Sequence, residues 1–272
     1  MDNIRQAIER AKGGQRSASP ALEPPRPAAR EIFGDALGRG KRVQDTDLDP
    51  LHLEAQRIVG HNGNDIRSRS FDMLRTEILQ SMDAKGWKTL AVTSPTPSCG
   101  KTFTSVNLAL SMSRRIERQV LLADLDLRKP HVADCMGIKC VDGGVSAVVE
   151  GRLELHDAIV SAKIGSSQLE VLPTKPASNS SDVASSAGME ALLQKLAGRS
   201  QSGIVILDLP PILTGHDVLS ILPHVDCLLF VTAVGKTKKS EIKECSKYLE
   251  GTNIVRFVLN KAAESAIPYI YY

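Results

Sequence analysis

The stretch SPTPSCGKT, residues 94–102, follows an apolar, β-rich run and opens a helical pattern. A phosphate-binding loop occurs in that context, and its strict form is Gly, four residues, then Gly-Lys-Ser/Thr. Residues 100–102 fit the second half of the form, whereas Pro95 stands where the first Gly belongs. Because Pro has no backbone N–H to donate, we expect the N–H groups of residues 98–102, at the start of the helix, to hold the anion.

Two side chains of this loop have separate expected roles. Lys101 would neutralise the β- and γ-phosphates of a nucleotide, and the hydroxyl group of Thr102 would bind Mg²⁺. A Gly-Lys-Thr tripeptide after a strand also arises by chance, so the loop alone does not establish a nucleotide site.

Acidic residues at the ends of two later apolar strands strengthen that interpretation. Asp124 ends the run QVLLAD, Asp126 follows two residues later, and Asp208 ends the run GIVILD. The carboxyl ends of parallel strands meet at one edge of an open α/β sheet. Asp also favours turns, which gives each residue a purely structural explanation. Their joint occurrence with the loop favours phosphoryl transfer, which requires a Lys, a hydroxyl group and carboxylates around Mg²⁺.

Strand-like and helix-like patterns alternate along the same part of the chain. The near-continuous apolar strands are typical of parallel sheets that are buried on both faces. The sequence therefore predicts an α/β fold, a doubly wound, mostly parallel sheet of the P-loop NTPase type. The expected strands cover residues 88–94, 119–124, 169–173, 203–211, 225–234 and 252–260, and the expected helices cover residues 101–115 and 188–198.

Composition excludes several other classes of protein. The net charge of +3 over 272 residues is too small to favour nucleic acid as a partner. The five Cys form no CxxC pair, which argues against zinc and, with the absence of a secretory core, favours a reducing cytoplasm. No apolar run approaches the roughly 20 residues that span a bilayer.

The chain divides into three predicted regions. Residues 1–12 form a short amphipathic pattern, either a frayed helix or an element that docks on a partner. Residues 13–50 are rich in Pro and Ala and are expected to be a disordered linker. Residues 51–272 are expected to form the P-loop domain together with a C-terminal tail.

Three motifs resemble those of the bacterial tyrosine kinases, in particular the cytoplasmic autokinases of exopolysaccharide loci. LLADLDLR at 121–128 is similar to the family's second motif, and VILDLPP at 205–211 is similar to its third. YIYY at 269–272 resembles its tyrosine-rich C-terminal tail. Together with the loop at 94–102, the resemblance covers most of the chain.

The resemblance implies a role for each matching residue, with ATP and Mg²⁺ as cofactors. The catalytic set would be Lys101, Asp124, Asp126, Asp208 and Arg128, with Asp124 helping to deprotonate the attacking tyrosine. The metal ligands would be Thr102, Asp124 and Asp208. ATP would be bound by Ser98, Cys99, Gly100, Lys101 and Thr102, with Asn260 at the adenine. The phosphoacceptors would be Tyr269, Tyr271 and Tyr272.

The resemblance also implies partners. A membrane protein that controls polysaccharide chain length would activate the kinase and recruit it from the cytoplasm to the inner membrane. A tyrosine phosphatase would reverse its reaction. Self-association, as a ring, would present each tail to a neighbouring active site in trans.

The sequence departs from the family at three places. One is the tail, which has only three Tyr and is shorter than in many members. Ser98-Cys99 replaces Gly-Glu in the loop, which removes a permissive glycine. The helix that the family uses for ring assembly has the pattern Glu-x-x-Arg-x-x-Arg. Here the matching residues are Arg69, Asp72 and Arg75, so the first two charges are exchanged. Asp72 would then pair with an Arg of its own helix or, in a ring of inverted polarity, with an Arg of the next subunit.

Three alternative functions stay open. A non-catalytic regulator would keep the nucleotide site only as a switch, and the altered loop leaves room for that. A partitioning-type ATPase would carry a signature Lys at position 96, where this chain has Thr96. A pure assembly adaptor would leave the three acidic motifs without a purpose.

Overall fold

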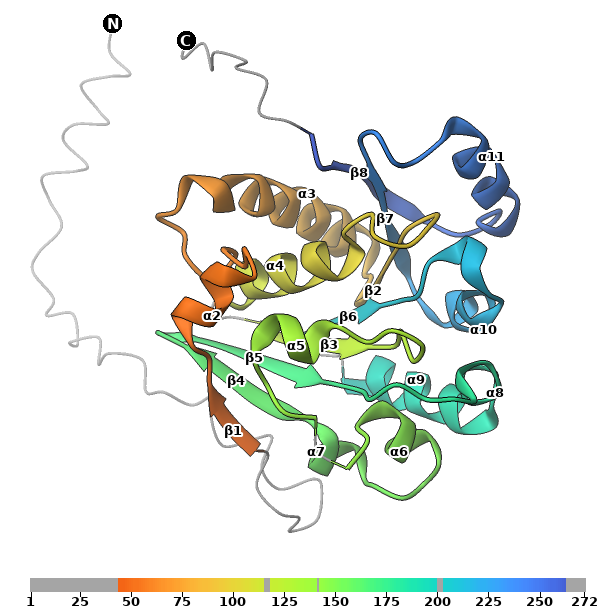
Figure 1. Ribbon diagram of the computed structural model, residues 1–272, viewed down its shortest axis with the longest axis horizontal. Coiled ribbons are helices and arrows are strands. Elements are labelled where there is room, and N and C mark those ends of the chain that lie inside the picture. Colours follow the sequence, from red (N-terminus) through yellow and green to blue (C-terminus); the bar gives the residue numbers. More distant parts are fainter. Residues whose placement is uncertain (1–43, 115–117, 141, 200–202, 263–272) are drawn as a thin grey trace, which may run out of the picture. The chain divides into compact units, whose positions relative to one another are not determined.

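The computed structural model describes residues 44–114, 118–140, 142–199 and 203–262. Through this part of the chain runs an eight-stranded sheet with the strand order β1-β4-β5-β3-β6-β2-β7-β8 (Figure 1). β4 pairs with β5 in antiparallel orientation, and the other neighbouring strands pair in parallel. The predicted doubly wound, mostly parallel α/β fold is thereby confirmed. The strands are β1 (Gln44–Asp47), β2 (Thr89–Thr93), β3 (Gln119–Asp124), β4 (Val160–Ile164), β5 (Ser167–Leu172), β6 (Gly203–Asp208), β7 (Cys227–Ala233) and β8 (Ile254–Asn260).

Helices cover the sheet on both faces (Figure 1). On one face α3 and α4 enclose an apolar cluster against the central strands, and on the other α9 and α10 enclose a second cluster. The helices are α2 (Pro50–Ala55), α3 (Arg69–Lys85), α4 (Lys101–Ser113), α5 (Val132–Met136), α6 (Val145–Val149), α7 (Leu155–Ala158), α8 (Ser180–Ala184), α9 (Ala187–Arg199), α10 (Asp217–Ile221) and α11 (Lys239–Tyr248), with 3-10 turns η1 (Ile66–Ser68), η2 (Ile212–Thr214) and η3 (Leu222–His224).

The central strands are apolar throughout because both of their faces are buried. In β2, Leu90 and Val92 pack in the α3/α4 cluster, whereas Ala91 packs in the α9/α10 cluster. Helix α4 is buried almost all round, which explains why small polar side chains such as Ser105 and Asn107 lie inside the protein. None of the helices in the described residues combines the length and apolar character needed to cross a membrane.

Two expectations about the sheet are wrong. Strand β1 lies within residues 13–50, which were expected to be linker, so the end of that range is part of the sheet. It was missed because its four residues, QDTD, are polar. Strand β8 was expected to be buried on both faces, but it forms an edge of the sheet and exposes Phe257 and Leu259. The predicted helix at residues 1–12 and most of the predicted linker lie outside the described residues.

Candidate functional site

The loop between β2 and α4 has a backbone that only particular residues tolerate. Ser98 has a φ of 63° and Gly100 a φ of 95°, both in the left-handed region. A Cβ atom on Gly100 would collide with the side-chain amide of Asn260, so both the conformation and the close approach favour glycine. Helix α4 then begins at Lys101, which leaves the N–H groups of its first turn at the end of the loop.

Asn260 brings the end of β8 to this loop. Its Nδ2 donates a hydrogen bond to the backbone carbonyl of Cys99, at 3.0 Å. The structure therefore places Asn260 beside the loop, although its contact with adenine stays a prediction. The contact also fixes the loop from the side opposite the acidic residues' strands, since β8 is the edge strand beyond β7.

The Cys99 side chain points into the protein. Its residue is fully buried, and Sγ lies 3.7 Å from Thr96 Oγ1 and 3.5 Å from Thr237 Oγ1. Cys99 thus packs between the loop and the β7–α11 connection. This packing agrees with Cys99 being a small residue that the loop tolerates. Cys99 would then contribute its backbone N–H, and not its side chain, to anion binding.

Lys101 lies at the centre of a buried polar cluster at the carboxyl ends of β3 and β6. Its Nζ is 2.7 Å from Asp126 Oδ2 and 3.6 Å from Asp208 Oδ2. Thr102 Oγ1 donates to Asp208 Oδ2 at 2.6 Å. Five residues from three separate motifs, including Asp124 described below, are therefore brought together at one edge of the sheet.

Ser105 belongs to the same cluster, and the sequence analysis missed it. Its Oγ donates to Asp208 Oδ1 at 2.9 Å, so each oxygen of that carboxylate accepts one hydroxyl group from α4. Ser105 lies four residues after Lys101, one turn further along the same helix face. That spacing was visible in the sequence, but a Ser in the middle of a helix is not distinctive.

Asp124 has a different environment from Asp126 and Asp208. Its Oδ2 accepts from the backbone N–H groups of His131 and Val132, both at 3.0 Å, and its Oδ1 accepts from that of Asp126 at 3.2 Å. Asp124 thereby closes the loop that follows β3. Asp124 is an unfavourable place for a negative charge, because it is buried and the Asp208 carboxylate is nearby.

The cluster shifts the pKa values of its members. Burial, followed by the charge of Asp208, raises the pKa of Asp124 from 3.8 to about 8. Burial also raises the pKa of Asp208, against the opposing effect of Lys101. For Lys101, burial lowers the pKa, but the charges of Asp208 and Asp126 outweigh it, and the pKa is raised.

The residues present fit a Mg²⁺–nucleotide complex. With all groups ionised, one lysine faces three buried carboxylates, a formal charge of −2 that a divalent cation would offset. The described residues contain no group of three His, Cys, Asp or Glu placed to hold a metal ion by themselves. Mg²⁺ at phosphate sites typically takes one or two carboxylates and completes its shell with phosphate oxygens and water. Thr102, Asp208 and Asp124 would be the protein groups nearest to that role.

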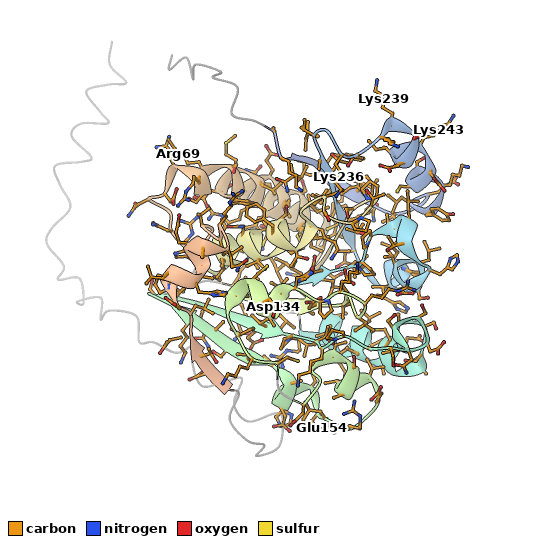
Figure 2. All side chains as sticks on the ribbon, in the orientation of Figure 1. Arg69, Asp134, Glu154, Lys236, Lys239 and Lys243 are labelled. Carbon is orange, nitrogen blue, oxygen red and sulfur yellow. The ribbon has the colours of Figure 1, made fainter. Side chains whose placement is uncertain are left out.

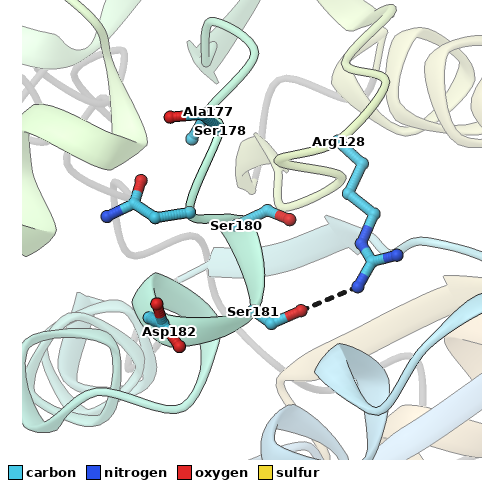
Figure 3. Close-up of a pocket in the computed structure, with 7 residues that line it drawn as sticks. Arg128, Ala177, Ser178, Ser180, Ser181 and Asp182 are labelled. Carbon is cyan, nitrogen blue, oxygen red and sulfur yellow. Dashed lines mark hydrogen bonds between the residues drawn. The ribbon is translucent and has the colours of Figure 1, made fainter.

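Arg128 makes its hydrogen bonds to residues outside this cluster, and its role at the site stays a prediction. Its Nε donates to Asp217 Oδ2 at 3.0 Å. Its Nη2 donates to Ser181 Oγ at 2.7 Å, and Figure 3 shows this second hydrogen bond. The guanidinium group lines an open pocket of about 450 Å³ together with residues 177–182. Asp217 and Ser181, which have no distinctive sequence pattern, orient the Arg128 guanidinium group.

Asp72 is occupied within its own subunit. It accepts hydrogen bonds from Ser111 Oγ at 2.6 Å and from Arg75 Nη1 at 3.1 Å, and it pairs with Arg114 at the end of α4. The sequence predicted a pair with an Arg of the same helix, which is Arg75. It did not predict the contacts with Ser111 and Arg114 at the end of α4. Arg69 is exposed at the start of α3 (Figure 2). The three C-terminal tyrosines lie outside the described residues.

Comparisons with known proteins agree with this geometry. No family model matches the chain. The chain is 28% identical over 220 residues to tyrosine-protein kinase wzc of Salmonella typhimurium, covering 80% of this chain and 30% of that protein. It is 27% identical to tyrosine-protein kinase CpsD of Streptococcus agalactiae serotype Ia, covering 73% of this chain and 84% of that one. It is 26% identical to tyrosine-protein kinase ptk of Acinetobacter johnsonii, covering 76% of this chain but 28% of that protein.

Solved structures give the same result. The kinase domain of the Escherichia coli tyrosine kinase ETK superposes with a TM-score of 0.69 at 26% identity, covering 79% of this chain and 83% of that one. The VpsO kinase domain superposes with a TM-score of 0.63 at 29% identity, covering 73% and 97%. The chain therefore spans less than a third of the length of several curated relatives and nearly the whole of the solved domains.

Proposed function

Because the chain belongs to the bacterial tyrosine kinase family, we propose that it is an ATP-dependent protein-tyrosine autokinase. The observation that carries the proposal is the buried cluster in which Lys101 meets Asp126 and Asp208 next to the Thr102 hydroxyl. Mg²⁺–ATP would supply the transferred phosphoryl group. In this reading Lys101 and the first N–H groups of α4 bind the phosphates, and Thr102 and Asp208 lie where the metal is expected.

Asp124 is the best candidate for the proton acceptor. A pKa of about 8 lies close to neutral pH, where a general base works most efficiently. Three backbone N–H groups donate hydrogen bonds to the Asp124 carboxylate and hold it in a fixed orientation, which general-base catalysis also requires. Arg128, held by Asp217 and Ser181 over an open pocket, would position the acceptor peptide rather than the phosphates.

We further propose that Tyr269, Tyr271 and Tyr272 accept the phosphate in trans within a self-associated kinase. A membrane protein of the polysaccharide chain-length class would activate it and recruit it to the membrane. Since Asp72 is held by Ser111, Arg75 and Arg114, the exposed Arg69 is the better candidate for a contact between subunits.

The test uses the purified full chain with labelled ATP and Mg²⁺, with and without the cytoplasmic segments of candidate membrane partners. Mass spectrometry then locates the phosphate. We expect it on the tail tyrosines and expect the triple Tyr269→Phe, Tyr271→Phe, Tyr272→Phe variant to lose it while still binding ATP. Phosphate on Tyr248, which is 42% exposed on α11, would contradict the tail assignment. ATP binding without any transfer under all of these conditions would instead favour the non-catalytic regulator.

A further inference from the structure

Strand β8 presents an uncovered apolar surface at the edge of the sheet. Phe257 is 62% exposed and Leu259 is 64% exposed, and Val234, at the end of the neighbouring β7, is 46% exposed. Among the described residues, no strand pairs with the outer edge of β8 (Figure 1). Exposed, apolar edge strands invite pairing with another strand, so folded proteins usually cover or charge them.

The exposed surface lies on one face of β8. The opposite face is covered by α3, where Arg256 Nε donates to Glu77 Oε2 at 2.8 Å and Val255 is buried. On the uncovered face, Phe257 makes an edge-to-face contact with Phe230, with ring centroids 5.6 Å apart, and its remaining surface faces outward. An added strand would therefore meet both unpaired backbone groups and apolar side chains.

We propose that the occupant of this edge is the C-terminal segment of the same chain, residues 263–272, bound to β8 as an antiparallel strand. An antiparallel edge strand on an otherwise parallel sheet is a common arrangement. The structure supports the start of this path, since Lys261 follows β8 directly with a φ of 59°. A left-handed residue at this point turns the chain away from the direction of β8, which an extended residue would not do.

Length and composition also fit this occupant. Twelve residues follow Asn260, and after a turn of about four, the remaining eight would extend for roughly 26 Å, compared with roughly 23 Å for the seven residues of β8. The segment ends in Ile-Pro-Tyr-Ile-Tyr-Tyr, which is rich in the β-branched and aromatic residues that favour strands. Because a short tether gives an effective concentration of about millimolar, the segment would outcompete a second copy of the chain at micromolar concentration.

One consequence rests on the proposed function. A tail that is bound along its own β8 is withheld from the active site of a neighbour, so the edge would compete with tail phosphorylation. The binding itself requires no kinase activity, and it is therefore tested without nucleotide.

The first experiment compares hydrogen exchange in the full chain and in a variant that ends at Ala262. We expect the amides of β8 to exchange at least ten-fold faster in the shortened chain, while those of the central strand β3 keep their rates. Both proteins are compared at a concentration where sedimentation gives them the same oligomeric state. Equal exchange rates in β8 would overturn the proposal. So would β8 protection in the full chain that increases with concentration together with dimer formation, because a second copy would then be the occupant.

The second experiment keeps the full chain and removes the apolar surface. In the Phe257→Ser, Leu259→Ser variant, we expect chymotrypsin to cleave at the tail tyrosines about ten-fold faster than in the wild type. The matched control is Met73→Ser, which replaces an apolar side chain that is 63% exposed on α3 and should leave the cleavage rate unchanged. Unaltered cleavage in the double variant, with β8 intact by circular dichroism and exchange, would show that these side chains do not hold the tail.

Discussion

Two clusters of charged side chains lie at opposite ends of helix α4, and they differ in how their charges balance. At its start, Lys101 faces Asp124, Asp126 and Asp208, so three acids meet one base, and the pKa values of Asp124 and Asp208 are raised. At its end, Asp72 is shared by Arg75 and Arg114, so two bases meet one acid at a half-buried position.

The difference indicates what each cluster does. Buried, surplus negative charge is unfavourable in the free protein and becomes favourable when a cation binds, so the Lys101 cluster is suited to a ligand. The Asp72 cluster joins α3 to α4 with hydrogen bonds that are already complete at Asp72, so it is suited to holding two helices together. Substitutions at the first should therefore change function, and substitutions at the second should change stability.

The largest expected effect is that of Lys101→Ala. It removes the only lysine that contacts Asp126 and Asp208 among the described residues, so the phosphates would lose their fixed counter-charge. We expect nucleotide binding and tail phosphorylation to fall below detection in calorimetry and phosphotyrosine blots. The matched control is Lys163→Ala, which breaks an exposed ion pair with Asp45 and should leave both unchanged. Phosphotyrosine at the wild-type level in Lys101→Ala would remove this residue from the mechanism.

Asp124→Asn should separate catalysis from binding. Asn keeps the shape of the side chain and one acceptor oxygen, but it cannot take a proton. We expect kcat to fall about 10²- to 10³-fold, as is typical for loss of a general base, with the nucleotide Kd changed less than about five-fold. Single-turnover kinetics beside equilibrium binding would measure the two effects. Wild-type turnover in this variant would contradict the role assigned to Asp124.

The same residue predicts how the stability of the ligand-free protein depends on pH. The pKa of Asp124 is about 8 in the folded protein against an ordinary 3.8, so the folded state prefers the protonated form. Raising the pH from about 4 to about 8 should therefore lower the free energy of unfolding, by a few kcal/mol at most. Asp124→Asn should flatten this slope without abolishing it, because burial also raises the pKa of Asp208. Urea titrations across this range would test it, and Asp83→Asn, an exposed carboxylate paired with Arg118, should keep the wild-type slope.

At the other cluster, Asp72→Ala should reduce stability and leave the nucleotide site intact. It leaves Arg75 and Arg114 facing each other without the shared carboxylate, at a half-buried position. We expect a loss of about 2 kcal/mol in the free energy of unfolding, between typical values for exposed and buried ion pairs. Nucleotide affinity measured in parallel should stay within about two-fold. A change in sedimentation at unchanged stability would instead indicate that Asp72 contacts a neighbouring subunit.

The sequence predicted local features of these clusters better than long-range ones. The end of β3 was located correctly at Asp124, where the run QVLLAD meets its first acidic residue, whereas β6 ends at Asp208, three residues before the end of the expected strand at 203–211. The contacts of Asp72 with Ser111 and Arg114 were not predicted, because they join residues about 40 positions apart through the packing of α3 against α4. Arg128 shows the same limit, since its motif specified the residue while Asp217, from another element, determines where the guanidinium group lies.

The smallest expected effect is that of Ser105→Ala, and it tests how finely the Lys101 cluster is arranged. Ser105 Oγ donates to one oxygen of Asp208 while Thr102 donates to the other, and the Ser105 hydrogen bond lowers the pKa of Asp208 against the effect of burial. Without it, Asp208 should hold its proton to higher pH and rotate more freely. Because one hydrogen bond contributes about 1 kcal/mol, we expect kcat to fall only about five-fold.

Two further readouts distinguish positioning from a structural role. The acid limb of the pH–rate profile should move to higher pH, and the Mg²⁺ concentration for half-maximal rate should rise several-fold. Ser113→Ala is the matched control, since it removes a buried hydroxyl group from the same helix whose bond goes to the Leu110 carbonyl. If both variants lowered the rate equally with the pH profile and Mg²⁺ requirement unchanged, Ser105 would serve the stability of α4 alone. The functional difference between the two ends of α4 would then depend on Lys101 and the three carboxylates alone. The Ser105 hydroxyl group would make no contribution to it.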